Sequence, residues 1–294
     1  MTSQRDRAVG AGMQLGSQLS VNFGSSIAGL IIPVVGSAAV VAGRQLVTMI
    51  VLLPVTRPRM RGRSLTELWP ALALGVALAG MNLAFYEAVG RIGVGPAVTI
   101  EFLGPLAIAL ATSRRFLDVL CAIGAGIGVY LLVGPEGDFD PFGVVMGLAA
   151  GVGWAAYILL TRRVAQQFRG LEGLAIASVV ALVLTLPIGA LTIDYGTLDW
   201  GVIWLLVVVG VLCSAIPYSL DNLVLRRITP RLYSIITALA PVLATFAGWI
   251  VLGQSLSALQ LLAIGIVCVS AGTAIATQRE QPSSPLEEAA SDIP

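Results

Sequence analysis

The sequence predicts an all-α polytopic membrane protein with ten transmembrane helices. Of its 294 residues, 57% are hydrophobic and only 11% are charged, whereas soluble domains carry about 25% charged residues. The apolar residues form long blocks, which disfavours the alternating pattern of a membrane β-barrel. The arginines gather in every second connection between these blocks, and such a bias is typical of a fixed membrane topology.

Ten apolar segments are each long enough to cross a bilayer as a helix, since a span needs about 20 residues. The first carries several Gln, Ser and Asn side chains, so we expect it to face protein or water. The segments are 9–31, 36–55, 68–88, 94–113, 116–134, 142–161, 172–191, 201–220, 231–252 and 258–277.

The arginines predict the orientation. All 17 basic residues are arginines. With the N-terminus in the cytoplasm, 15 of them fall on the cytoplasmic side, while Arg91 lies in an outer loop and Arg44 within a span. The positive-inside rule therefore places both termini in the cytoplasm. The polar, Pro- and Ser-rich tail, 278–294, is predicted to be a disordered cytoplasmic end.

Composition also excludes several functions. The chain has no histidine, which rules out His-based metal sites and acid–base catalysis by histidine. No zinc-protease, nucleophile-elbow or Walker motif is present, so we expect neither an enzyme nor a cofactor. Cys121, Cys213 and Cys268 lie far apart in apolar runs and are interpreted as small hydrophobic residues. The net charge of +1 gives no reason to expect nucleic acid as a partner.

An internal repeat divides the chain. Residues 86–111 align with 222–247 at a shift of 136, and this places Pro105 over Pro241. The matched segments are the fourth and the ninth, so the repeats are five segments each, over 9–134 and 142–277. An odd number of spans inverts the second repeat relative to the first, as in many secondary transporters. The two prolines are expected to interrupt equivalent helices, either beside a binding site or only for packing.

Glu101 is the most unusual residue of the spans, because the stretch around it, VTIEFLGPLAIAL, is otherwise apolar. It lies about seven residues from the outer end of its segment, or ~10 Å. A carboxyl group there must be protonated, paired or open to a water-filled cavity. We interpret it as a proton-coupling or substrate-binding residue, with a structural hydrogen bond or ion pair as the alternative.

Arg44 lies at a matching depth, about eight residues or ~12 Å into the second segment. The two side chains are thus expected to face one cavity. An arginine fork suits the carboxylate of a substrate. A structural pair with Glu101 and snorkelling to the surface are the alternatives.

Polar and aromatic residues within or at the ends of other spans form a third group of candidates, which either line the cavity or link helices. Trp154 and Tyr157 are separated by three residues and are expected to wall the cavity together. Thr237 occupies the repeat position of Glu101. Glycines four residues apart at 143, 147 and 151, and at 124 and 128, predict close helix packing. The candidates are Asn22, Asn82, Tyr86, Trp154, Tyr157, Ser214, Tyr218 and Thr237.

Three stretches, at 82–115, 153–163 and 239–267, resemble the EamA family of the drug/metabolite transporter superfamily, and within it the bacterial threonine/homoserine exporters. The most specific is NLAFYEAVGRIGVGPAVTIEFLGPLAIALATSRR. The resemblance implies two inverted five-helix repeats in the bacterial inner membrane, no ATP, and export coupled to protons.

The leading hypothesis is a proton-coupled exporter of small amino acids such as threonine or homoserine. Other amino acids, drugs or polar metabolites are alternative substrates. A passive channel, which would conduct continuously without proton coupling, and an intramembrane enzyme are alternatives of other classes.

Overall fold

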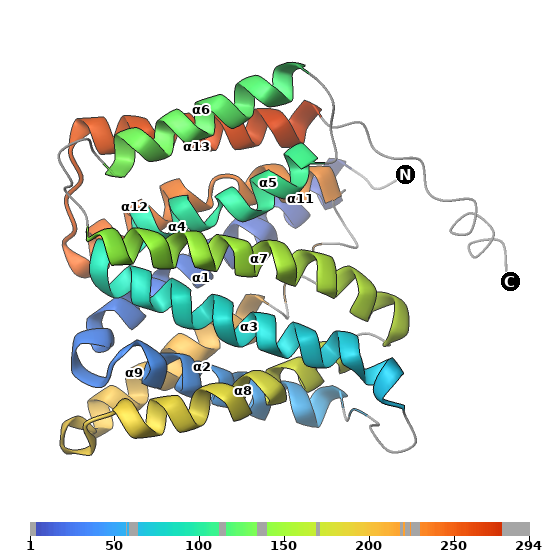
Figure 1. Cartoon of the computed structure of the whole chain (residues 1–294), viewed down its shortest axis with the longest axis vertical. Helices are drawn as coiled ribbons and strands as arrows, with labels where there is room; N and C mark the ends of the chain where they lie inside the picture. Colours follow the sequence, from blue (N-terminus) through green and yellow to red (C-terminus); the bar gives the residue numbers. More distant parts are fainter. Residues whose placement is uncertain are drawn as a thin grey trace, which may run out of the picture.

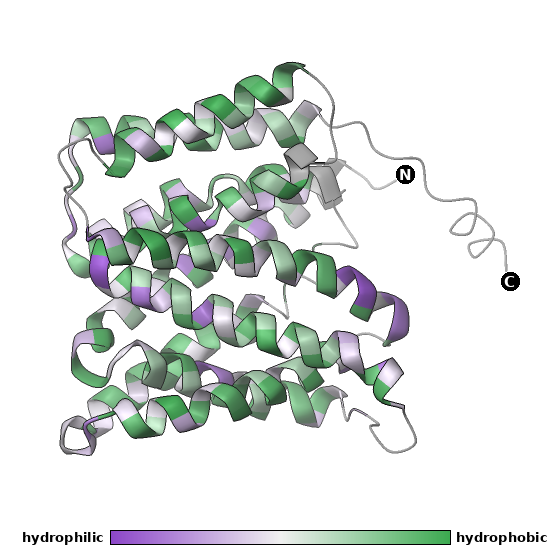
Figure 2. Ribbon diagram, viewed as in Figure 1, coloured by the Kyte–Doolittle hydropathy of each residue, from purple (hydrophilic) through white to green (hydrophobic). Residues whose placement is uncertain are grey.

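The computed structural model describes residues 4–56, 58, 64–111, 116–133, 140–168, 171–217, 220, 224 and 230–277, and all regular structure in this part is helical. The tail, 278–294, and Tyr218 lie outside the described residues. Within the described part, seven helices are long and apolar enough to cross a membrane, and shorter apolar helices cover Val94–Ile108, Val119–Val133 and Trp200–Ser214. Figure 2 shows hydrophobic residues over most of the helix surfaces, as expected of helices that face lipid.

The helices lie side by side in one bundle (Figure 1). Their bounds are α1 Gln4–Val35, α2 Ser37–Thr56, α3 Leu65–Ile92, α4 Val94–Glu101, α5 Leu103–Ala111, α6 Phe116–Val133, α7 Pro141–Gln167, α8 Glu172–Thr192, the 3₁₀ turn η1 Tyr195–Thr197, α9 Trp200–Gly210, the π-helical turn η2 Val211–Ala215, α11 Pro230–Thr237, α12 Ala240–Leu252 and α13 Ala258–Thr277.

The main packing pairs are α3 with α7, α2 with α8, and α6 with α13 (Figure 1). The glycines of α7 allow its close approach to α3 and α4. A Cβ at Gly143 would lie 2.7 Å from Ile92, and one at Gly147 would lie 3.1 Å from Ile100. On α6, a Cβ at Gly124 would lie 2.6 Å from the Ser270 hydroxyl of α13. Small residues thus bring the backbones together, which is a common way for membrane helices to associate.

One helix is broken in the first half of the chain. α4 ends at Glu101, Phe102 forms a turn, and α5 begins at Leu103. The cause is Pro105, because it has no N–H to donate to the carbonyl of residue 101. The break packs tightly against α7, where a Cβ at Gly151 would lie 3.0 Å from the Glu101 carbonyl oxygen.

A second break of the same kind lies in the other half. α11 ends at Thr237, a turn covers residues 238 and 239, and α12 begins at Ala240. Here Pro241 deprives the carbonyl of Thr237 of its donor. The two breaks meet in the interior, because Phe102 and Ala238 belong to the same buried cluster.

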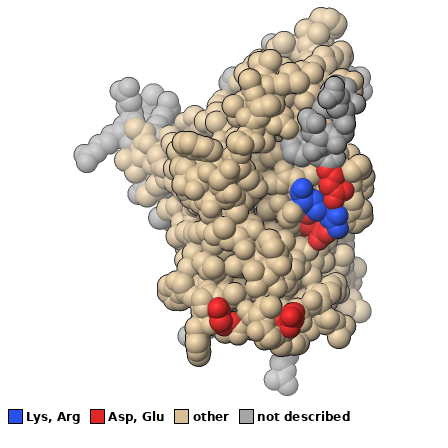
Figure 3. Space-filling model, turned by 90° about the vertical axis from the view of Figure 1, so that its left-hand side faces the viewer, with Lys and Arg blue, Asp and Glu red and all other residues tan. Residues whose placement is uncertain are grey.

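One end of the bundle carries a network of charged side chains. Arg91 pairs with Glu87 at 2.8 Å and with Asp140 at 2.6 Å, and the Ser37 hydroxyl donates to Glu87 at 2.6 Å. These contacts join the ends of α2, α3 and α7. Figure 3 shows basic and acidic atoms gathered in one place on this face. The hydrogen bonds from Arg91 and from the Phe142 N–H hold the pKa of Asp140 below its ordinary value.

The close contact at the first break predicts the effect of a small substitution. Gly104→Ala places a methyl group against the backbone of Gly151, so we expect the free energy of unfolding to fall by about 1–3 kcal/mol. The measurement is the midpoint of thermal unfolding of the purified protein. Gly126→Ala is the matched control, because a Cβ there meets no atom within 4 Å. An equal midpoint in both variants would contradict the tight packing of α5 on α7.

The ion pair of Asp140 predicts a pH dependence. A carboxyl group with a lowered pKa stabilises the fold above the unfolded-state pKa, and this contribution is lost as the pH falls through the folded-state pKa. We expect Asp140→Asn, which keeps an oxygen to cap α7, to lower the unfolding temperature at pH 7 and to match the wild type once the pH is below the lowered folded-state pKa of Asp140. Asp199→Asn, at the cap of α9, is the control and should show a smaller effect. A difference for Asp140→Asn that persists at low pH would exclude the ion pair as its source.

Candidate functional site

Arg44 is the centre of a polar cluster inside the bundle. It lies on α2, it is half-buried, and its guanidinium is directed at α3 and η2. One Nη donates to Asn82 Oδ1 at 2.6 Å, and the other donates to the Cys213 carbonyl at 3.2 Å. Nε donates to Ser214 Oγ at 3.4 Å. The planar fork of the guanidinium matches several acceptors at once, so these contacts fix its orientation.

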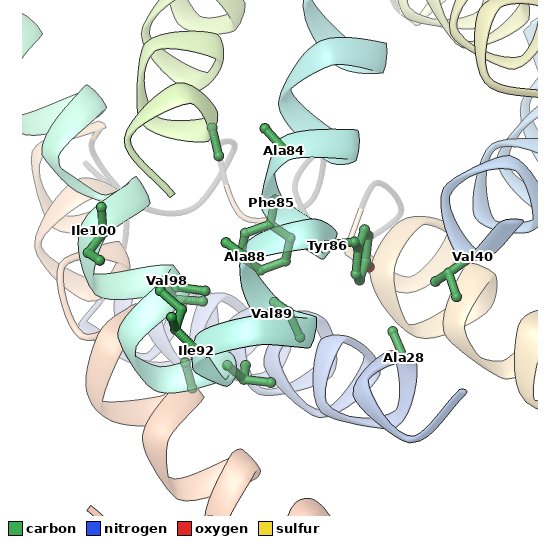
Figure 4. Close-up of a cluster of buried hydrophobic side chains, with 14 of the residues drawn as sticks. Ala28, Val40, Ala84, Phe85, Tyr86, Ala88, Val89, Ile92, Val98 and Ile100 are labelled. Atoms are coloured by element: carbon green, nitrogen blue, oxygen red, sulfur yellow. The ribbon is translucent and has the colours of Figure 1, made fainter. Parts of the chain in front are cut away.

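Two residues of α3 form one wall of the cluster. Asn82 and Tyr86 are four residues apart and therefore lie on the same helix face. The Asn82 amide nitrogen donates to the Leu78 carbonyl at 2.7 Å, which leaves its oxygen to accept from Arg44. Tyr86 is fully buried, and its ring centroid is 5.9 Å from the Arg44 guanidinium carbon. Figure 4 shows Phe85 and Tyr86 on α3 and places Tyr86 on the side where Val40 and Ala28 lie.

The π-helical turn η2 forms the opposite wall. In this turn the Ile216 N–H bonds to the Val211 carbonyl instead of to the carbonyl of Leu212. The Leu212 carbonyl accepts a hydrogen bond from Ser20 Oγ of α1 at 2.7 Å. The wide turn therefore ties α1 and α9 together and brings Cys213 and Ser214 to Arg44. Such π-bulges are frequent at functional sites.

Cys213 has a role that sequence reasoning missed. We interpreted it as a small hydrophobic residue, and it is buried as expected. Its sulfur, however, lies 3.7 Å from the Tyr86 hydroxyl and 3.9 Å from Ser25 Oγ, and its carbonyl accepts from Arg44. The sequence feature that points to this role is the adjacent Ser214, a polar residue within an apolar segment. All three cysteines are free thiols, and the described residues contain no group of three or more metal-ligating side chains.

Glu101 lies at the break between α4 and α5, and its exposed fraction is only 8%. It is within electrostatic range of Arg44. The residue after it, Phe102, contacts the ring of Trp154 edge to face, with 5.7 Å between the ring centroids. A buried carboxyl group and a half-buried guanidinium within electrostatic range of each other can receive a ligand that carries both charges.

The remaining candidates are spread over the interior. Asn22 is buried on α1, and its amide donates to the Gln18 carbonyl of its own helix at 2.8 Å. Trp154 packs in the cluster of Phe102, whereas Tyr157 packs in another, between α3, α7 and α8. Thr237 accepts a hydrogen bond from Gln14 of α1 at 3.1 Å.

The fold and this site define a class of protein. Membrane helices broken in the interior, with buried ionisable groups beside a break, are typical of secondary transporters. Comparison with known proteins leads to the same class. Residues 141–277 match the model of the EamA-like transporter family.

The similarity to relatives of known name extends over nearly the whole chain. The threonine/homoserine exporter RhtA of Escherichia coli (strain K12) is 35% identical over 266 residues, which cover 89% of this chain and 90% of the exporter. RhtA of Salmonella typhimurium (strain LT2) is 33% identical over 265 residues, with the same coverage. A solved crystal structure with 22% identity shares the fold, with a TM-score of 0.59 over 94% of this chain and 97% of that chain.

The chain therefore belongs to the EamA-like transporter family. It is a multi-pass membrane protein and a transporter, not an enzyme, as the sequence predicted.

The Arg44 cluster predicts unequal effects of removing two buried asparagine side chains. Asn82→Ala removes a hydrogen bond to a charged group, so we expect it to lower the free energy of unfolding by about 1.5–3 kcal/mol. Asn22→Ala removes a bond between neutral groups within one helix and should cost about 0.5–1.5 kcal/mol. Thermal unfolding of both purified variants measures the difference. An equal loss in both would show that the contact with Arg44 does not stabilise the fold.

Proposed function

We propose that this protein exports small amino acids of the threonine and homoserine kind from the cytoplasm, across the bacterial inner membrane, in exchange for protons. The observation that carries the proposal is the 35% identity to RhtA over 89% of the chain, together with the half-buried Arg44 and the buried Glu101. Export and the substrate class are transferred from the relatives. The proton exchange is inferred from the chemistry of the site.

The proposed architecture is ten spans in two inverted repeats, 9–134 and 142–277. The seven long and the three shorter apolar helices of the described part support this proposal. The family match, 141–277, coincides with the second repeat. The breaks after Glu101 and Thr237 are 136 residues apart, which equals the shift of the sequence repeat.

The packing of the helices supports the same symmetry. Under the repeat, α1, α2, α3, α4 with α5, and α6 correspond to α7, α8, α9, α11 with α12, and α13. The pair α3 and α7 then corresponds to α9 and α1, and the pair α1 and α12 corresponds to α7 with α4 and α5. Each of these pairs is in contact. The pairs α2 with α8 and α6 with α13 lie across the proposed axis.

The proposed orientation places both termini in the cytoplasm. Fifteen of the 17 arginines lie on the same side of the membrane as the termini, and the positive-inside rule assigns that side to the cytoplasm. The opposite end of the bundle carries Asp140, Asp194 and Asp199 at the caps of α7, η1 and α9, and it holds the Arg91 network (Figure 3). We assign this end to the outside. The tail after residue 277 would then be cytoplasmic.

The proposed exchange follows from the two charges of an amino acid. Its carboxylate suits the fixed fork of Arg44, and its ammonium group suits the ionised carboxylate of Glu101. A proton on Glu101 removes the charge that the ammonium group needs, so the proton and the substrate compete for one carboxylate. Asn82, Tyr86 and Ser214 hold the fork in place. Competition of this kind produces an antiporter if the protein can switch between its inward-open and outward-open states with either the proton or the substrate bound.

Transport of labelled threonine and homoserine from preloaded proteoliposomes tests the proposal. We expect wild-type efflux to be driven by an imposed proton gradient and to stop when the gradient is collapsed. Glu101→Gln should lose the gradient-driven transport, and Arg44→Ala should lower the rate at least about tenfold, since a hydrogen bond to a charged group is worth about 1.5–3 kcal/mol.

Glu172→Gln and Arg162→Ala, which lie at the start of α8 and on the exposed part of α7, are the matched controls and should transport like the wild type. Gradient-driven transport that persists in Glu101→Gln would make Glu101 a structural residue. Transport of other amino acids or drugs instead of threonine and homoserine would exclude the proposed substrates but not the class.

A further inference from the structure

Gln14 is a fully buried polar residue whose amide oxygen lacks a hydrogen-bond donor. It lies on α1 with an exposed fraction of 0%. Its amide nitrogen donates to Thr237 Oγ1 at 3.1 Å, while its amide oxygen has no hydrogen-bond partner in the described part of the chain. Thr237 uses its only hydroxyl proton on the Tyr233 carbonyl. If the amide were turned over, its oxygen would face a hydroxyl with no free proton, and both of its polar atoms would lack a partner.

A second acceptor lies at the same place. Thr237 is the last residue of α11, and Pro241 cannot donate to its carbonyl. Thr237 is partly exposed, so the described residues do not seal this break. Two oxygen atoms here, of an amide and a backbone carbonyl, can accept hydrogen bonds. A buried acceptor without a donor is costly, so the break favours a ligand that supplies one.

This pair of residues is distinct from the Arg44 cluster. Gln14 precedes Ser20, which donates to the Leu212 carbonyl of η2, by six residues on the same helix, or about 9 Å at 1.5 Å per residue. Gln14 and the Arg44 cluster therefore lie at different levels along α1.

We propose that Gln14 and Thr237 form a second substrate site, which binds the hydroxyl group of a hydroxylated amino acid. The inference rests on the proposed function. Neutral acceptors suit a hydroxyl donor, while an ammonium group is better matched by the carboxylate of Glu101 at the other break. In the proposed orientation the N-terminal end of α1 is cytoplasmic, so the substrate meets Gln14 first and Arg44 afterwards. Gln14 thereby selects for the hydroxyl group at entry.

The test compares threonine with valine, which has a methyl group in place of the hydroxyl. The concentrations of each that inhibit uptake of labelled threonine by half are measured in proteoliposomes of the full chain. We expect the wild type to prefer threonine. Gln14→Leu, of similar volume, should raise the half-inhibitory concentration of threonine about tenfold and leave that of valine nearly unchanged, since only the hydroxyl loses its acceptor.

Thr237→Val is the second variant and should reduce the same preference, because it removes the hydroxyl that holds Gln14. Gln260→Leu is the matched control, since Gln260 only caps α13 by accepting from the Ser257 N–H; it should behave like the wild type. A wild-type preference that survives in both Gln14→Leu and Thr237→Val overturns the second site alone. A wild type that transports no threonine overturns the proposed function and this site with it.

Discussion

A backbone carbonyl without a donor is the constraint on which the rest of this structure depends. In a bilayer no water is available to pair with it, so such a group must be covered by protein or line a cavity. Pro105 and Pro241 each remove the helical donor of one backbone carbonyl, at Glu101 and Thr237. Both breaks therefore lie inside the bundle, where Phe102 and Ala238 share a buried cluster. The glycines of α7 and the polar face of α1 follow from the need to enclose them.

The same constraint explains the polar residues around the breaks. The π-turn η2 deprives the Leu212 carbonyl of its helical donor, and Ser20 replaces it. Arg44 is accommodated because Asn82, Ser214 and a backbone carbonyl accept its protons. An arginine held by neutral groups keeps a fixed direction before any ligand arrives. Preorganisation of this kind reduces the entropy that binding costs.

The sequence predicts the helical spans and part of the site, because burial of the backbone in lipid enforces long apolar helices. The sequence singles out Arg44, Asn82 and Tyr86 by residue type, and the structure brings the three side chains together. The π-turn has no compositional signal, so only the neighbouring Ser214 points to the contacts of Cys213. Gln14 and Thr237 are separated by 223 residues, and no local pattern relates them. Trp154 and Tyr157 point about 60° apart on α7, which is enough to place them in different clusters.

The two breaks are alike in backbone and different in chemistry, and this difference matters for the proposed transport. Equivalent halves offer two arrangements of similar energy, which alternating access requires. If both breaks carried a carboxyl group, the substrate would be held by charge at both and would leave slowly. In the proposed transport, with Glu101 at one break and Thr237 at the other, the neutral site would bind weakly and select, while the charged site would bind tightly and couple to the proton. The substrate would then meet the stronger site only after it has passed the selective one.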